Sequence, residues 1–365
     1  MKQSLLAETE ASSCYFRTSV DGDGRKALVQ ITERCNLHCA HCFVSSMREG
    51  RDMSLVDFGD RVLPRLIAAR VERVTLTGGE PFLHPDILDL CRVVVEAGLS
   101  VGICTNATQT SEEQMAYLTD PGSVHINVSF DGFREDSHGK FRGDRSSFEL
   151  TRETTRRFAD FGLLQGLLST PNALTNAEEF TDLCAFAVEI GAEYVLMNPL
   201  SAFGRGIKSK SRLEATRDSM RAIRAVTERF AGPGFELVQI RFPNDSLPLA
   251  GCDAGKFLYV FTDGQTAICP YLVFAARNPV SVHQDSEFLV SNILQHDIAK
   301  DLDDCDFHKR YPMGQNSACS SCSIMDVCGK GCPAAVVADG ARIGQVDVDQ
   351  CPAPDGRVLL ALTGK

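Results

Sequence analysis

The sequence predicts an α/β fold, a partial (β/α)6 TIM-like barrel followed by a smaller cysteine-rich domain. Short apolar runs alternate with amphipathic stretches through residues 26–234. The runs are apolar on both faces, as buried parallel strands are. Helical regularity fades after about residue 235, where cysteines accumulate. Strands that alternate with helices indicate a parallel sheet with right-handed crossovers, and residues 235–365 are expected to form the second domain.

Six strands are predicted, and four helices have recognisable starts or ends. Residues 1–25 are polar and are expected to form a loose leader. Gly232-Pro233-Gly234 is expected to separate the domains, and a hairpin is expected around Thr262-Asp263-Gly264. The strands are Ala27–Thr32, Val74–Thr77, Val101–Thr105, Val124–Phe130, Leu163–Leu168 and Tyr194–Met197. The helices are Leu55–Ala69 capped by Ser54, a helix from His84-Pro85-Asp86 to Ala97, Ala177–Ile190 capped by Thr175 or Asn176, and Arg212–Phe230.

Bulk composition excludes some classes of function. The net charge is −11, so no basic footprint indicates nucleic acid or an anionic membrane as a partner. No apolar run approaches membrane-spanning length, and an acidic residue at Glu8 interrupts any signal-peptide core. A cytoplasmic location is therefore expected. In that reducing compartment the 15 cysteines should be thiols or metal ligands.

The run Cys35-Asn36-Leu37-His38-Cys39-Ala40-His41-Cys42 follows the first predicted strand directly. Three thiolates in one short loop can hold a cubane iron–sulfur cluster and leave its fourth iron without a protein ligand. Thiolate ligands also favour iron–sulfur centres over hard metals. The alternatives are a zinc knuckle with His38 or His41 as fourth ligand, and three unrelated core cysteines.

With Gly78-Gly79-Glu80-Pro81 after the second strand, the chain resembles the radical S-adenosylmethionine (radical SAM) superfamily. The resemblance implies that SAM chelates the open iron of a [4Fe-4S] cluster. Reductive cleavage of SAM would then give methionine and a 5′-deoxyadenosyl radical. It also implies SAM contacts from Gly78, Gly79 and Glu80, from His41 just before the third cysteine, and from Asn106, Ser129 and Arg142 later in the chain. The alternatives are a solvated His41, an Asp131 that caps a turn, and a surface ion pair of Arg142 with Asp144.

The C-terminal cysteines resemble the SPASM extension of radical SAM enzymes, which carries two auxiliary iron–sulfur clusters. By this resemblance, one cluster is held by Cys319, Cys322, Cys328 and Cys351, and the other by Cys252, Cys269 and Cys332. Seven ligands leave one position open, for which Cys305, Asp253 and substrate are candidates. A pair of structural zinc sites is the alternative. Cys91 and Cys184 are expected to be core residues, and Cys104 to lie near the barrel mouth.

Three functions compete at this level. The first is a peptide maturase that oxidatively modifies a ribosomally made precursor, for example by a thioether or carbon–carbon crosslink. The second is a dehydrogenase or epimerase of a sugar or aminoglycoside-type metabolite, and the third is a non-catalytic zinc or electron-transfer protein. The family resemblance implies flavodoxin or ferredoxin as electron donor. Because only a short segment precedes the first strand, a maturase is expected to need a separate leader-peptide recognition protein.

Overall fold

One ten-stranded sheet organises the computed structural model, which describes residues 13–15, 22–244 and 248–352. The strand order is β10-β9-β8-β1-β2-β3-β4-β5-β6-β7. Neighbouring strands from β8 through β7 are parallel, whereas β9 and β10 are antiparallel to their neighbours. The strands are β1 Arg25–Thr32, β2 Val71–Gly78, β3 Ser100–Thr105, β4 Val124–Ser129, β5 Leu164–Ser169, β6 Tyr194–Met197, β7 Glu236–Gln239, β8 Phe257–Val260, β9 Gln265–Ala267 and β10 Leu289–Asn292.

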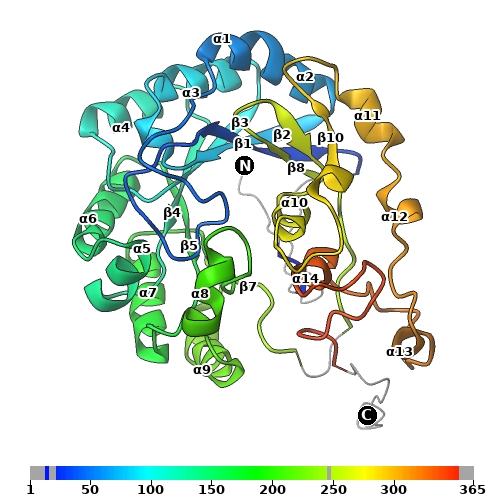
Figure 1. Ribbon diagram of the computed structural model, residues 1–365. Coiled ribbons are helices and arrows are strands. Elements are labelled where there is room, and N and C mark those ends of the chain that lie inside the picture. Colours follow the sequence, from blue (N-terminus) through cyan, green and yellow to red (C-terminus); the bar gives the residue numbers. More distant parts are fainter. Residues whose placement is uncertain (1–12, 16–21, 245–247, 353–365) are drawn as a thin grey trace.

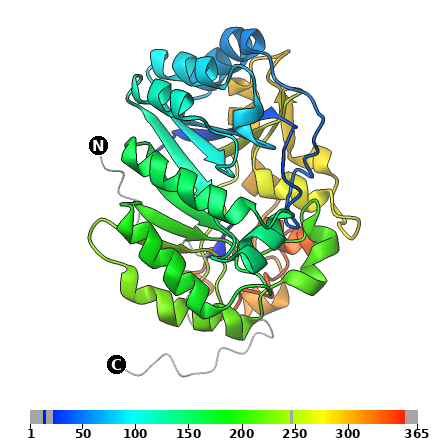
Figure 2. The ribbon, with the colours of Figure 1, turned by 90° about the vertical axis from the view of Figure 1, so that its left-hand side faces the viewer.

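Helices cover the outer face of the curved parallel strands, as Figures 1 and 2 show. The α-helices are α1 Leu55–Asp57, α2 Leu63–Ala68, α3 Ile87–Glu96, α4 Glu112–Thr119, α5 Lys140–Arg142, α6 Ser147–Asp160, α7 Ala177–Glu189, α8 Gly206–Leu213, α9 Arg217–Thr227, α10 Pro270–Ala276, α11 Ala299–Asp304, α12 Phe307–Arg310, α13 Ser317–Ser320 and α14 Pro333–Ala338. Shorter 3-10 and π segments are η2 Phe58–Val62, η3 Pro81–Leu83, η4 Glu135–Gly139, η5 Glu228–Phe230 and η6 Asp285–Phe288.

The partial parallel α/β barrel is confirmed, and all six predicted strands are present as β1 to β6. Ser54 caps the first helical stretch by accepting a hydrogen bond from the Asp57 amide at 3.0 Å. Asn176, and not Thr175, caps α7. The single helix predicted over Arg212–Phe230 is wrong, because the chain breaks after α8. Thr216 then caps α9 by accepting from the Ser219 amide.

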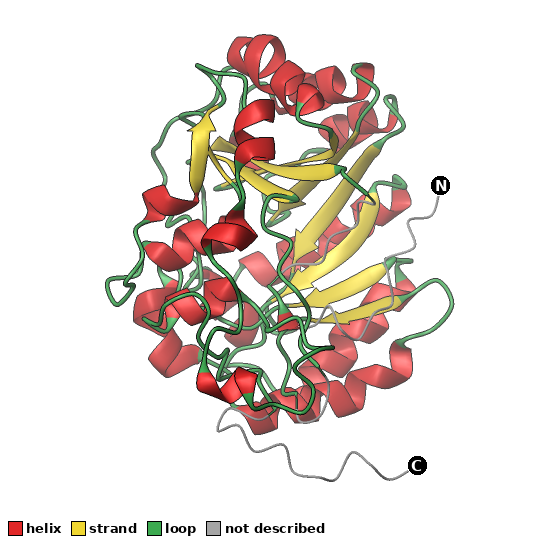
Figure 3. Cartoon of the chain, turned by 90° about the vertical axis from the view of Figure 1, so that its right-hand side faces the viewer, coloured by secondary structure: helices red, strands yellow, loops and turns green. Residues whose placement is uncertain are grey.

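The sheet does not stop at the glycine-rich segment where the second domain was expected to begin. A seventh parallel strand, β7, pairs with β6 just beyond Gly234. The predicted hairpin is β8–β9, and β8 also pairs in parallel with β1. The start of the C-terminal region therefore extends the barrel sheet on the other side of β1. The rest of that region is mostly loop with short helices (Figure 3).

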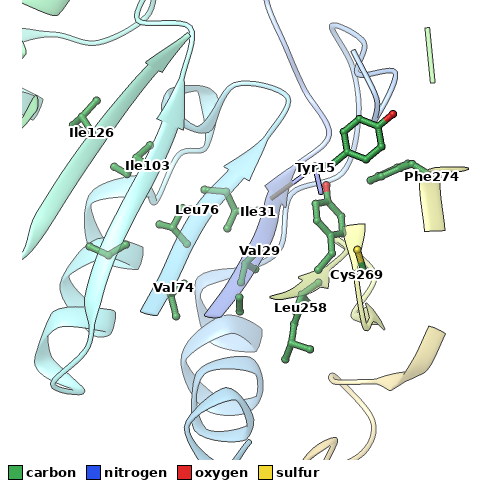
Figure 4. Packing of buried hydrophobic residues seen from close by; sticks show 14 of the residues in the cluster. Tyr15, Val29, Ile31, Val74, Leu76, Ile103, Ile126, Leu258, Cys269 and Phe274 are labelled. Atoms are coloured by element: carbon green, nitrogen blue, oxygen red, sulfur yellow. The ribbon is translucent and has the colours of Figure 1, made fainter. Parts of the chain in front are cut away.

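The core follows the strands across this joint. Figure 4 shows Ile103 of β3, Leu76 of β2, Ile31 of β1 and Leu258 of β8 on successive strands, and all four are fully buried. Cys91 and Cys184 are also fully buried, as predicted. Burial of such apolar side chains contributes roughly 1.5–3 kcal/mol each. The core thus fixes β1, and with it the loop that follows β1.

Residues Ser13, Cys14 and Tyr15 correct the expectation of a loose leader. Each is less than 10% exposed, and Tyr15 stacks on Tyr271 with ring centroids 5.1 Å apart. The other parts of residues 1–21 lie outside the described residues. Among the residues that the structure describes, no helix has the length and apolarity needed to cross a membrane.

Candidate functional site

A cavity of about 420 Å³ runs along the parallel strands, from Lys26 and Ser100 at the starts of β1 and β3 to the loops at the carboxyl ends. Parallel barrels place loops from several strands at this end, where ligands bind. Nine of the ten residues predicted to hold the first cluster or SAM line the cavity, and Glu80 is the exception. The nine are Cys35, Cys39, His41, Cys42, Gly78, Gly79, Asn106, Ser129 and Arg142. The structure therefore brings together residues from the ends of four strands and from α5.

The cysteine loop, residues 35–42, is held by backbone hydrogen bonds from distant elements. The His38 amide donates to the Arg142 carbonyl at 3.2 Å, and the Ala40 amide donates to the Phe141 carbonyl at 2.8 Å. Arg205, just before α8, donates its Nε to the Cys39 carbonyl at 2.8 Å, and its own amide donates to the Cys42 carbonyl at 3.0 Å. The loop is thus fixed from α5 on one side and α8 on the other.

Gly78 and Gly79 are required by the packing of the cysteine loop. A Cβ atom on Gly79 would lie 2.0 Å from the Arg34 carbonyl oxygen, and one on Gly78 would lie 2.3 Å from the Thr32 carbonyl oxygen. Gly78 also has a φ of +158°, at the edge of the range that favours glycine. The two glycines therefore let the end of β2 approach the start of the cysteine loop, besides lining the cavity.

Glu80 makes structural hydrogen bonds at the end of β2, and its contact with SAM stays a prediction. Its side chain is fully buried and does not line the cavity. The carboxylate accepts hydrogen bonds from Thr105 Oγ1 at 2.7 Å and from the Asn106 amide at 2.8 Å. Burial raises the pKa of Glu80, and these donors act in the opposite direction. Glu80 therefore ties the end of β2 to the end of β3.

Asn106 extends this connection to the cysteine loop. Its Nδ2 donates to Asn36 Oδ1 at 3.0 Å, while its side chain also borders the cavity. The sequence-predicted role of Asn106 as a SAM contact stays a prediction. What the structure adds is a polar chain from Glu80 through Asn106 to the cysteine loop.

Arg142 and Asp131 form a buried ion pair at the cavity wall. Arg142 Nη2 lies 2.8 Å from Asp131 Oδ2, and Arg142 Nη1 lies 4.0 Å from Cys39 Sγ. Burial opposes ionisation of Asp131, but Arg142, His41 and His138 outweigh it and hold the pKa of that carboxyl below its ordinary value. Both alternatives are therefore wrong. Arg142 pairs with Asp131 and is not a surface partner of Asp144. Asp131 does not cap a local turn but accepts a hydrogen bond from the distant Thr170 amide at 2.8 Å.

His41 lies against this ion pair. Its ring stacks on Phe141 with centroids 4.8 Å apart and planes 6° from parallel, and its Nε2 lies 3.6 Å from Asp131 Oδ2. Burial lowers the pKa of His41 to about 4, so the ring is neutral at pH 7. A neutral, stacked ring in the cavity wall replaces the alternative of a solvated loop histidine.

Burial disfavours the charged thiolate form of the cysteine loop in the metal-free chain. Burial raises the pKa of Cys35 to about 11 and that of Cys39 to about 12. Metal centres bind thiolates, so loading the loop would release protons. Arg142 beside Cys39 favours the thiolate form. The soft donor set, its shared cavity and the neighbouring guanidinium fit an iron–sulfur cluster with one open iron.

The C-terminal cysteines lie in two groups, and their role as ligands of auxiliary clusters stays a prediction. Cys319, Cys322, Cys328 and Cys351 border one small cavity of about 30 Å³. Cys252, Cys269 and Cys332 interact electrostatically with one another. Within the described ranges, no three Cys, His, Asp or Glu side chains converge on one point as ligands of a single metal ion would. Four soft sulfur donors around one cavity fit a cluster of several irons.

Sequence reasoning missed Arg205 and Tyr15. Both line the cavity, as does Asn198, which follows β6. Asn198 Nδ2 donates to the Tyr15 carbonyl at 3.1 Å. Arg205 stands between Gly204 and Gly206, but nothing local in the sequence indicates contacts with a loop more than 160 residues earlier. Cys104 also lies in the wall, as expected.

Residues 29–187 match the model of the Radical SAM superfamily. A PqqA peptide cyclase from Rhodopseudomonas palustris is 29% identical over 56% of this chain and 55% of its own length. An AdoMet-dependent heme synthase from Methanosarcina barkeri is 32% identical over 49% of this chain and 52% of its own length. The chain thus spans about half the length of these curated relatives.

Among solved structures, Streptococcus suis SuiB bound to precursor peptide SuiA is similar with a TM-score of 0.67. It is 18% identical, and the match covers 87% of this chain and 74% of that one. This likeness shows the same fold through most of the chain. The superfamily match runs from within β1 to within α7, so the sequence similarity lies in the part of the barrel that carries the cysteine loop.

Proposed function

We propose that this chain cleaves SAM reductively and uses the resulting radical to modify a ribosomally made peptide oxidatively. The observation that carries the proposal is the shared cavity, in which three thiols of one loop face Ser129, Asn106 and Arg142. When bound, a [4Fe-4S] cluster and SAM supply a 5′-deoxyadenosyl radical that removes a hydrogen atom from substrate. The names of two relatives, a peptide cyclase and a protein bound to its precursor peptide, support a peptide as substrate.

The chain's own residues would bind and orient the reactants. Cys35, Cys39 and Cys42 would hold three irons and leave the fourth open to SAM. Arg142 offers a guanidinium for the SAM carboxylate, although Asp131 already pairs with it. The neutral ring of His41 offers a face for adenine. Enclosing the reacting groups in this cavity would exclude water and position one C–H bond.

The proposal extends to the C-terminal cysteines and to an electron donor. Cys319, Cys322, Cys328 and Cys351 would hold one auxiliary cluster, and Cys252, Cys269 and Cys332 would hold another, as in a SPASM domain. A low-potential flavodoxin or ferredoxin would reduce the first cluster in the cytoplasm. A crosslink, as a thioether or carbon–carbon bond, is the proposed modification. Forming it removes two hydrogens from the peptide: one would go to the 5′-deoxyadenosyl radical, and the other would leave as a proton while its electron passes to an auxiliary cluster.

The test uses the anaerobically reconstituted full chain with SAM and dithionite. We expect 5′-deoxyadenosine, and with a short peptide encoded beside the gene we expect a product lighter by two hydrogen atoms. Mass spectrometry measures both. The Cys35→Ala, Cys39→Ala, Cys42→Ala triple variant is the control. Radical formation without any change in the peptide would refute the peptide proposal and leave the SAM chemistry standing.

The similarity to a heme synthase supports a second candidate, oxidation or epimerisation of a small-molecule metabolite. The cavity volume of about 420 Å³ lies in the range of small-molecule sites. Production of 5′-deoxyadenosine that rises several-fold with a metabolite, but not with the peptide, would favour this candidate.

A further inference from the structure

Cys14 lies at the auxiliary site formed by Cys252, Cys269 and Cys332. Its thiol interacts electrostatically with the thiols of Cys332 and Cys252. Cys14 Sγ also lies 3.3 Å from the Gly251 carbonyl oxygen, next to Cys252 in the chain. Cys14, Cys269 and Cys332 are each at most 5% exposed and belong to one core cluster. Four sulfur donors from four distant segments therefore meet in one buried place.

The segment that carries Cys14 is anchored on both sides of this cysteine. The Ala250 amide donates to Ser13 Oγ at 2.8 Å, and Arg241 Nη1 donates to the Ser13 carbonyl at 2.9 Å. The Arg241 guanidinium lies over the Tyr15 ring, 4.9 Å from its centroid. The Tyr15 amide donates to the Cys332 sulfur. These contacts fix the Cys14 thiol beside Cys332 and do not depend on Cys14 itself.

The other candidates for the missing ligand fit less well. Cys305 is exposed at the end of α11, and its charged neighbours are Arg310 and Asp306. Asp253 follows Cys252 directly, but it would place a hard oxygen among soft thiolates. Cys14 adds a fourth thiol to three thiols, which is the ligand set of a fully coordinated cubane.

We propose that Cys14 is the fourth thiolate ligand of the auxiliary cluster held by Cys252, Cys269 and Cys332. The inference rests on the proposed function, because it assumes an iron–sulfur cluster at this site. It means that this cluster has no iron open to substrate. It also means that Tyr15, in the wall of the main cavity, is adjacent in the chain to a cluster ligand.

The test uses the full chain in a background with Cys35→Ala, Cys39→Ala and Cys42→Ala, so that the remaining iron belongs to the auxiliary sites. Cys14→Ala is introduced there, with Cys91→Ala as matched control, since Cys91 is a fully buried cysteine in the outer helix α3. Iron analysis, Mössbauer spectra and EPR after mild ferricyanide oxidation are compared. A cubane with only three cysteine ligands loses its unligated iron on oxidation and becomes a [3Fe–4S] cluster.

We expect Cys14→Ala to lose about one iron per chain on oxidation and to give a [3Fe–4S] EPR signal. The background and Cys91→Ala should give neither. Cys14→Ser, which offers an oxygen ligand in a similar volume, should retain the iron with an altered Mössbauer spectrum. If the Cys14→Ala chain does not take up an iron–sulfur cluster, the Cys14→Ser variant still tests the role of Cys14.

Two results would overturn the inference, and they differ in what else they refute. If the background already gives the [3Fe–4S] signal in the yield seen for Cys14→Ala, an iron is open although Cys14 is present. In that case only the role of Cys14 is wrong. If the background holds zinc in place of iron, the auxiliary clusters are also refuted. Production of 5′-deoxyadenosine by the wild-type chain separately reports whether the SAM chemistry stands.

Discussion

Two of the three cysteine groups in the described part of the chain are built in opposite ways. The first takes its three thiols from eight consecutive residues that follow one strand, and hydrogen bonds from α5 and Arg205 fix their loop. The second group joins Cys252, Cys269 and Cys332 to Cys14. The Cys14 thiol contacts the carbonyl of Gly251, which lies more than 230 residues later in the chain. A site made by local spacing can be found in a sequence, whereas a site made by tertiary packing requires the fold.

We call the cysteine loop at residues 35–42 the local site, and the group of Cys14, Cys252, Cys269 and Cys332 the dispersed site. The largest expected effect is at the local site. Replacing Cys35, Cys39 and Cys42 by Ala should reduce 5′-deoxyadenosine formation to background, because no thiolate would remain in the loop to hold the cluster. Chromatography of anaerobic reactions measures this product. Cys91→Ala should retain wild-type formation. Undiminished SAM cleavage in the triple variant would show that the radical site lies elsewhere.

A second prediction concerns the charged support of the dispersed site. Arg241 and Asp347 form a nearly fully buried ion pair, and Asp347 also accepts from the Cys332 amide at 3.2 Å. Asp347→Ala leaves the guanidinium buried without this partner, so it should lower the free energy of unfolding by about 3–5 kcal/mol. Urea denaturation of the metal-free chain measures the change.

The matched control for this ion pair is Asp218→Ala, which removes an exposed partner of Arg221 on α9. It should change the free energy of unfolding by no more than about 1 kcal/mol. Equal effects of the two substitutions would show that the pair of Asp347 with Arg241 does not stabilise the region around Cys332.

A smaller effect is expected from the carboxylate that links the local site to β3. In Glu80→Gln, the side-chain NH2 replaces one oxygen that accepts from the backbone amide of Asn106 or of Phe82, leaving a donor facing a donor. The loss should be about 1–3 kcal/mol of stability, together with weaker SAM binding by the loaded chain. Denaturation and calorimetry measure the two quantities. Glu113→Gln on α4 is the exposed control, and indistinguishable behaviour of the two variants would contradict the role given to Glu80.

The pH dependence of stability should also distinguish the barrel mouth. Burial lowers the pKa of His138 to about 3, with Arg142 and His41 acting in the same direction and Asp131 opposing them. Between pH 6.5 and about 3 the unfolded chain binds more protons at this residue, so stability falls as pH falls. The contribution is at most about 1.4 kcal/mol per pH unit. His138→Asn should reduce this slope in the metal-free chain, and exposed His296→Asn should not.

The smallest expected effect tests the dispersed site again. Cys305 is exposed, and its charged neighbours are Arg310 and Asp306, neither of which belongs to the dispersed site. Cys305→Ala should therefore leave the iron content and the EPR spectrum unchanged. A loss of one cluster in this variant would give Cys305 the position that we assign to Cys14.

The parts of the fold that the sequence predicted are those with a local physical signal. β1 to β6 are apolar on both faces, and the Ser54 and Asn176 caps precede clear amphipathic stretches. β7 was missed because its four residues include Glu236 and Gln239 and are mostly half-buried. The break before Thr216 was missed because the helical pattern continues across it.

The candidate site divides in the same manner. The cysteine loop and Gly78-Gly79 were visible as short motifs, and the cavity gathers them as expected. Arg205 and Cys14 gave no local signal, because their partners are distant in the chain. The exact side chains that touch SAM stay predictions, and Glu80 shows why: a motif residue can act by holding the backbone that forms the site.

The central claim is that the cysteine loop holds a cluster whose open iron faces the cavity. The most direct measurement is the EPR spectrum of the dithionite-reduced, anaerobically reconstituted chain before and after addition of SAM. We expect SAM to change one component of the spectrum, and we expect that component to be absent from the Cys35, Cys39, Cys42 triple variant. A spectrum that SAM leaves unchanged, or a change that persists in the triple variant, would contradict the claim.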